Sequence, residues 1–139
     1  MAERVVFVGF GQPVRGREER AIEVFNEFVA LLGRMQGDGR IEGMDVCLLD
    51  PHGGDLGGFF MIHGSAQQCG ALNEDEEFRR AATDASLIVE NFGIVPARTG
   101  ESVGQEMAIY TEAVRKVGVG AHALAGAGAG AGAGAHNGG

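Results

Sequence analysis

The chain has 139 residues, of which 45% are hydrophobic and 22% are charged, as expected for one globular domain. A net charge of −8 argues against nucleic acid and against a membrane surface as the main partner. No apolar run reaches the roughly 20 residues that a membrane span needs. Two cysteines are too few for a disulfide framework, and no signal peptide is evident, so we expect a cytoplasmic protein.

The first half of the chain predicts three strands and one helix. The β-branched and aromatic run Arg4–Phe10 predicts a strand. Apolar residues spaced by three and four predict a helix over about residues 17–35. Residues 41–49 and 59–63 predict two further strands, and they should form an antiparallel hairpin because their connection is short and rich in glycine.

The second half of this region predicts a helix in two pieces and a fourth strand. Ser65 and Gln68 have the spacing of a capping box. Asn73 stands three residues before Glu76, which predicts that the helix restarts at Asn73. Residues 87–95 predict the last strand, which ends at a proline or lies at a sheet edge.

The resulting order of strand, helix, strand, strand, helix, strand predicts a ferredoxin-like α+β domain over residues 1–100. It implies a four-stranded antiparallel sheet with helices on one face. Either Phe59 and Met61 or Phe60 and Ile62 must then face away from the helices. A second copy of the chain is the simplest cover for such an apolar face, so we expect a homodimer or a higher homo-oligomer.

Two further segments follow this domain. Residues 101–117 predict an amphipathic helix that either packs on its own domain or binds a protein partner. Its apolar seam has spacings of 4, 3, 4 and 3 and consists of Val103, Met107, Tyr110, Val114 and Val117. Residues 118–139 are a low-complexity segment of glycine and alanine, which predicts a disordered tail. The alternative for this segment is a silk-like strand, because glycine and alanine alternate strictly.

The strand order and the glycine-rich hairpin resemble the dimeric α+β barrel superfamily over about residues 4–100. That superfamily includes cofactor-independent monooxygenases of the antibiotic-biosynthesis type and YCII-related proteins. Residues 16–18 and 52–60 are similar to an uncharacterised bacterial branch near these groups. The resemblance implies that two sheets close into a shared barrel and that no cofactor is needed. The chain departs from the oxygenases in having no tryptophan, which those enzymes often use in the pocket.

The candidate catalytic residues are His52, His63 and Asp50. A neutral imidazole next to a carboxylate supports general acid–base chemistry near neutral pH. YCII-related proteins carry a paired histidine and aspartate, and the resemblance offers Asp50 and His52 for that pair, although their local setting does not match closely. With Asp55, the same groups are compatible with an open metal site, although plain turn chemistry also accounts for them, and we assign no metal.

Two sets of residues are candidates for ligand binding. An apolar metabolite would be held by Phe7, Phe59, Met61 and Phe92. Arg15 and Arg17 precede a predicted helix and would attract a small anion, or they are simply solvated. The chain contains no dinucleotide-binding or Walker pattern, so no cofactor is expected.

Three functions are compatible with these patterns. The first is a non-catalytic binding or assembly module that forms a homodimeric barrel. The second is a small cofactor-independent enzyme, monooxygenase-like or YCII-like, that uses His/Asp acid–base chemistry on an organic substrate. The third is a binder of an apolar small molecule. The presence and the lining of an internal cavity should distinguish them.

Overall fold

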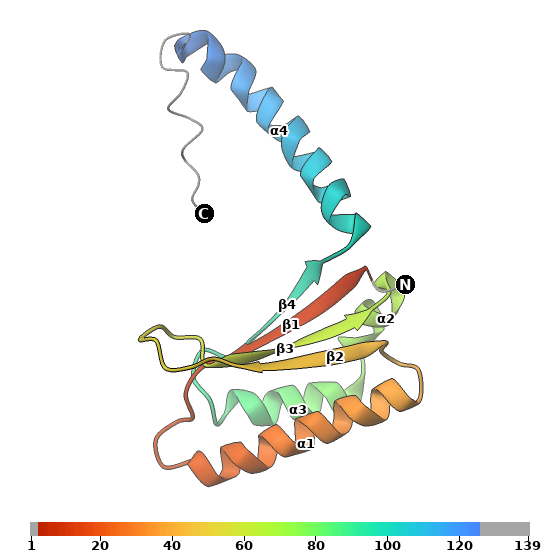
Figure 1. Ribbon diagram of the computed structural model, residues 1–139, viewed down its shortest axis with the longest axis vertical. Helices are drawn as coiled ribbons and strands as arrows, with labels where there is room; N and C mark the ends of the chain where they lie inside the picture. The colour runs from red at the N-terminus through yellow and green to blue at the C-terminus, as the bar shows by residue number, and fades with distance from the viewer. Residues whose placement is uncertain (1–2, 126–139) are drawn as a thin grey trace. The chain divides into compact units, whose positions relative to one another are not determined.

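The computed structural model describes residues 3–125, which divide after Ser102 into two compact units (Figure 1). The elements are, in chain order, β1 (Arg4–Phe10), α1 (Glu18–Gly37), β2 (Gly43–Leu48), β3 (Gly58–Gly64), α2 (Ala66–Leu72), α3 (Glu76–Ser86), β4 (Gly93–Arg98) and α4 (Glu101–Ala125). The first unit holds all the elements up to β4, and the described part of the second consists of α4 from Val103 onward.

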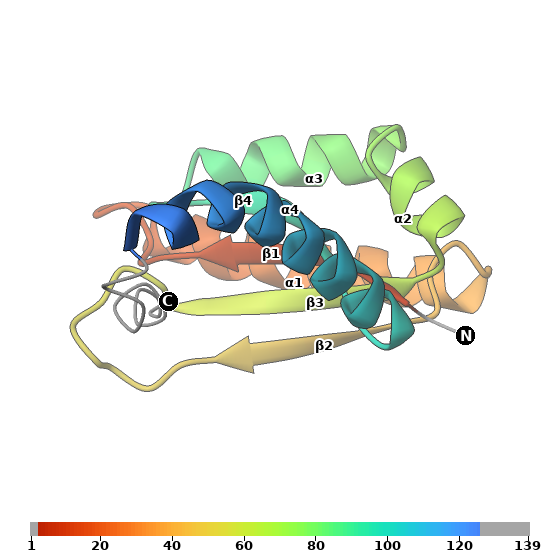
Figure 2. The same ribbon diagram turned by 90° about the horizontal axis from the view of Figure 1, so that it is seen from above.

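The four strands form one sheet in the order β2-β3-β1-β4, and all neighbouring strands are antiparallel. Helices α1 and α3 lie together against one face of this sheet, as both views show (Figures 1 and 2). The sheet order and the single layer of helices confirm the ferredoxin-like α+β prediction.

The main core fills the space between the sheet and these helices. Phe60 and Ile62 of β3 are nearly fully buried there, next to Val8 and Val6 of β1. The ring of Phe28, on α1, packs edge-on against Phe60 with centroids 4.9 Å apart. Alternate residues of β3 therefore point into the core, and Phe60 and Ile62 are the pair that faces the helices.

The opposite face of the sheet, which we call the outer face, is also apolar. Strand register places Val95, Phe7, Met61 and Asp45 in one row across it, from β4 to β2. The Phe7 ring lies over Gly9, where a Cβ atom would come within 2.8 Å of that ring. Phe59 and Met61 are thus the pair that faces away from the helices, one of the two arrangements expected from the sequence.

The fourth strand begins at Gly93, so the prediction of a strand from residue 87 is wrong at its start. Ile88 is buried in a second small core cluster with Ala21 and Val24 instead of lying in the sheet. Residues 88–90 pair with residues 11–14 outside the sheet, through bonds such as Val14 N–H to Ile88 O at 2.8 Å. Asn91, whose φ of 54° is left-handed, then turns the chain into β4.

The cap of α2 is as predicted, whereas the cap of α3 is not. Ser65 and Gln68 form both halves of a capping box. The N-cap of α3 is Asp75, whose carboxylate accepts from Phe78 N–H at 3.0 Å. Asn73 is instead the C-cap of α2. The two helices are therefore separated by a short turn that the spacing of Asn73 and Glu76 did not reveal.

Helix α4 continues to Ala125, past the predicted end at Val117. The start of the predicted tail is thus helical, and its remainder, residues 126–139, lies outside the described residues. The five residues of the predicted seam are all exposed. No helix among residues 3–125 is both long and apolar enough to cross a membrane.

Candidate functional site

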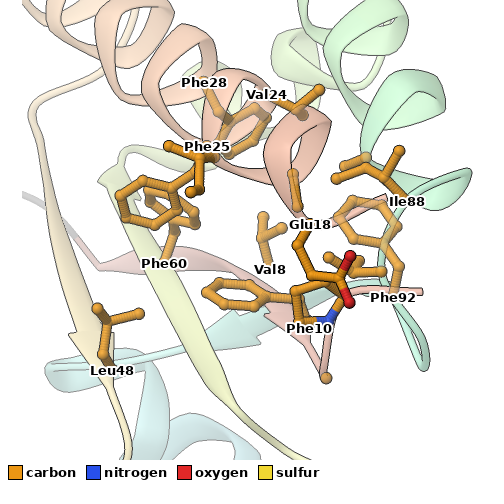
Figure 3. Close-up of a pocket in the computed structure, with 16 residues that line it drawn as sticks. Val8, Phe10, Glu18, Val24, Phe25, Phe28, Leu48, Phe60, Ile88 and Phe92 are labelled. Atoms are coloured by element: carbon orange, nitrogen blue, oxygen red, sulfur yellow. The ribbon is translucent and has the colours of Figure 1, made fainter. Parts of the chain in front are cut away.

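An apolar pocket of about 420 Å³ lies between the sheet and α1, at the end of the sheet where β1 finishes (Figure 3). Its walls carry five phenylalanine rings, those of Phe10, Phe25, Phe28, Phe60 and Phe92. The volume lies within the range of sites that hold small organic molecules. Because the strands and α1 fix most of these rings, the pocket is part of the folded core and does not depend on a mobile loop.

The end wall of the pocket is the paired stretch formed by residues 11–14 and 88–92. Gly11 donates its N–H to Glu90 O at 2.7 Å. A Cβ atom at Gly11 would lie 2.8 Å from both Glu90 O and Asp55 O, so only glycine allows the chains to approach this closely. This pairing carries Ile88 and Phe92 to the pocket.

The opening of the pocket is apolar as well. Ile22 of α1 and Leu48 of β2 line the pocket, yet they are 63% and 64% exposed. Glu18 provides the single charged or polar side chain of the lining. Its Oε1 accepts from Gly16 N–H at 3.0 Å. The site therefore combines a large apolar wall with one carboxylate.

His52 is tied into the loop between β2 and β3. Its Nδ1 accepts from Gly54 N–H at 3.1 Å, so the neutral ring carries its proton on Nε2, which donates to Leu56 O at 2.7 Å. Both ring nitrogens are thus used to hold the turn. This geometry agrees with the structural alternative for the loop.

His63 lies on the outer face and pairs with a residue that was not among the candidates. Its Nε2 lies 2.7 Å from Oδ2 of Asp45 on the neighbouring strand β2. The signal in the sequence was the alternation of β2, which sets Asp45 on the same face as His63 once the hairpin register is known.

The structure does not bring the candidate histidines together. His52 lies in the loop before Gly58, while His63 lies five residues into β3, about 17 Å further along the strand. Asp50 is exposed in the same loop as His52. Within residues 3–125, no three His, Cys, Asp or Glu side chains gather as metal ligands. The three residues therefore do not form a joint acid–base site within one protomer.

The structure also divides the candidate ligand-binding residues. Phe92 lines the pocket, whereas Phe7, Phe59 and Met61 lie on the outer face. The Phe7 and Phe59 rings contact each other with centroids 5.0 Å apart. The remaining pocket aromatics were missed because the sequence marks Phe25 and Phe28 only as the apolar stripe of a helix.

The two candidate arginines do not line the pocket. Arg15 is exposed, and the guanidinium of Arg17 donates to the backbone oxygen of Leu87. The two cysteines are unpaired, and burial raises the pKa of the Cys69 thiol above its usual value. Cys69 is therefore a poor nucleophile at neutral pH.

The chain matches no protein-family model and no curated protein. It is similar in structure to a dimeric ferredoxin-like protein of unknown function from Bacteroides fragilis, with 13% identity and a TM-score of 0.52. That alignment covers 68% of this chain and 95% of the other. SnoaB, a cofactor-independent oxygenase from Streptomyces nogalater, aligns at 19% identity over 71% of this chain and 97% of its own, with a TM-score of 0.45. The first likeness confirms the ferredoxin-like α+β fold.

Proposed function

We propose that this protein is a non-catalytic binding module that works as a homodimeric α+β barrel and holds a small apolar molecule in each protomer. The observation that carries the proposal is the pocket beside α1, which is apolar except for Glu18. None of the candidate acid–base residues, His52, His63 and Asp50, lines it. A site of this composition retains a ligand by burial and supplies no acid–base pair for its conversion.

The outer face of the sheet supports the dimer. Phe7, Met61 and Val95 form a continuous apolar row there, and Val95 is 52% exposed. Burial of apolar surface contributes about 25 cal/mol per Å², so pairing two such faces favours association. The similar protein from Bacteroides fragilis is itself dimeric. We extend this property to the present chain.

Helix α4 supports a further protein contact. Its seam repeats at the spacing of a coiled coil, and the residues at both ends of it, Val103 and Val117, are 45% and 72% exposed. Exposed apolar rows of this kind are typical of interaction surfaces. A partner bound through α4 would make the protein an assembly module as well as a carrier.

A reducing, cytoplasmic setting is consistent with the cysteines. Cys47 and Cys69 are both free thiols. Unpaired cysteines are usual in compartments that keep thiols reduced. We therefore place the binding function in the cytoplasm.

Titration calorimetry with 1-naphthalenemethanol, an apolar neutral probe, tests the binding function. We expect one site per chain. Ala85→Leu places three extra carbon atoms in the pocket and should weaken binding about tenfold. Ala82→Leu makes the same change on α3 outside the pocket lining and should leave the Kd unchanged. Absence of binding to the wild-type chain, or equal binding to both variants, would refute the proposal.

A cofactor-independent enzyme is the second candidate, and the Asp45–His63 pair is the observation that favours it. A carboxylate bonded to an imidazole is a common acid–base arrangement. The pair lies on the outer face, so a second protomer would have to close the site over it. Under this alternative, His63→Gln would abolish turnover of a compound that the wild-type chain converts. The affinity for the naphthyl probe would stay unchanged.

A further inference from the structure

We infer that the pocket beside α1 selects ligands that carry a protonated amine on an apolar body. This inference rests on the proposed binding function and adds the chemical class of the ligand.

Glu18 is the charged group of the site, and its carboxylate can accept further hydrogen bonds. One oxygen, Oε1, accepts from Gly16 N–H at 3.0 Å, and a carboxylate accepts further hydrogen bonds at both oxygens. Among residues 3–118, no basic side chain lies within salt-bridge distance of it. Other acidic groups of the helices do have such partners; for example, Glu23 is paired with Arg20 at 3.0 Å. Glu18 is exposed, so it offers an unneutralised charge at the solvent-facing part of the pocket lining.

The aromatic walls favour the same kind of ligand. The face of a phenylalanine ring is electronegative, so it attracts a cation as well as apolar surface. Figure 3 shows Glu18 on the side of the pocket where Phe92 lies and away from Leu48. A ligand amine would thus meet Glu18 and Phe92 at one end. Its apolar body would extend toward Leu48 at the other.

An anionic ligand is disfavoured by the same arrangement. Arg15, Arg17 and Arg20 are the arginines near Glu18 in the sequence, and none of them lines the pocket. Arg20 is paired with Glu23. Arg17 is held by the backbone oxygen of Leu87. A ligand carboxylate in the pocket would face Glu18 without a compensating cation, and like charges repel.

Three naphthyl probes of similar size test the inference by calorimetry on the full chain. They are 1-naphthylmethylamine, 1-naphthalenemethanol and 1-naphthoic acid. We expect the amine to bind about fivefold more tightly than the alcohol, in keeping with a charge-assisted hydrogen bond at a partly exposed site, and the acid to bind most weakly. Glu18→Gln should remove this preference, so that the amine and the alcohol bind with about equal affinity.

Glu19→Gln is the matched control. Glu19 lies in the same first turn of α1, has the same charge and does not line the pocket. It should leave all three affinities unchanged. Equal affinities for the amine and the acid, or equal effects of the two variants, would overturn the inference while the binding function stands. Failure of the alcohol to bind would overturn both.

Discussion

Asp45 and His63 are joined by a 2.7 Å contact between Oδ2 and Nε2 across β2 and β3, on the outer face of the sheet. Their strands are antiparallel, and the register sets Asp45 opposite Met61 and His63 opposite Gly43, so the contact is a diagonal one. Diagonal neighbours on one face are within reach of long side chains. The pair is therefore a product of strand register, and it is separate from the loop that holds His52.

This separation predicts that His52 and His63 act independently. We expect the changes in unfolding free energy for His52→Gln and His63→Gln to add in the double variant to within about 0.5 kcal/mol, as is usual for distant sites. Urea denaturation of the four proteins measures the coupling. A coupling energy well above that value would show that the two imidazoles share a network.

The dimer predicted from the outer face depends on Val95. Val95→Lys places a charge in the apolar row and should shift the protein from dimer to monomer in sedimentation velocity at micromolar concentration. Leu87→Lys is the control, because Leu87 is similarly exposed, at 60% against 52%, but lies at the end of α3. A wild-type chain that sediments as a monomer would contradict the prediction.

The bonds between Arg40 and nearby carboxylates predict that the stability of the fold depends on pH. It bonds Asp38 beyond the end of α1 and the N-cap Asp75 of α3, with a 2.9 Å contact to the latter. Its hydrogen bond lowers the pKa of Asp38 below the ordinary value of 3.8. A carboxyl whose pKa is lowered on folding contributes stability above its unfolded pKa, and this stability is lost as the pH falls through the folded value.

Arg40→Ala should therefore lower the urea midpoint at neutral pH, and the difference from wild type should shrink as the pH falls below 3.8, the ordinary pKa of Asp38, because its carboxyl becomes protonated. Arg80→Ala is the matched control. Arg80 makes two exposed hydrogen bonds, both to Glu76 on its own helix, and such exposed pairs contribute little. A difference that is constant with pH would show that Arg40 acts through packing alone.

Removal of the segment from Gly118 onward should leave the first unit intact. Among residues 3–118, whose burial the structure describes, every buried apolar residue lies between Val5 and Ile88. We expect the melting temperature to change by less than about 3 °C, which corresponds to well under 1 kcal/mol. Differential scanning calorimetry measures it. A larger decrease would show that the segment packs on the first unit.

The sequence by itself determined the elements whose signals are local. Arg4–Phe10 is a strand in the residues predicted, and the Ser65–Gln68 box begins a helix, because β-branched runs and capping geometry depend on neighbours in the chain. The order of these elements also predicted the ferredoxin-like sheet. Alternation in β3 showed that both faces of the sheet are apolar, although it did not show which pair of residues faces the helices.

The tertiary structure decided the features that depend on how distant segments of the chain pair with one another. Ile88 and Val89 have the composition of a strand, yet they pack beside Ala21 and Val24 because residues 88–90 pair with residues 11–14. That pairing also forms the end wall of the pocket. The contact between Asp45 and His63 likewise depends on register, and a local pattern does not fix the register of two strands joined by a glycine-rich loop.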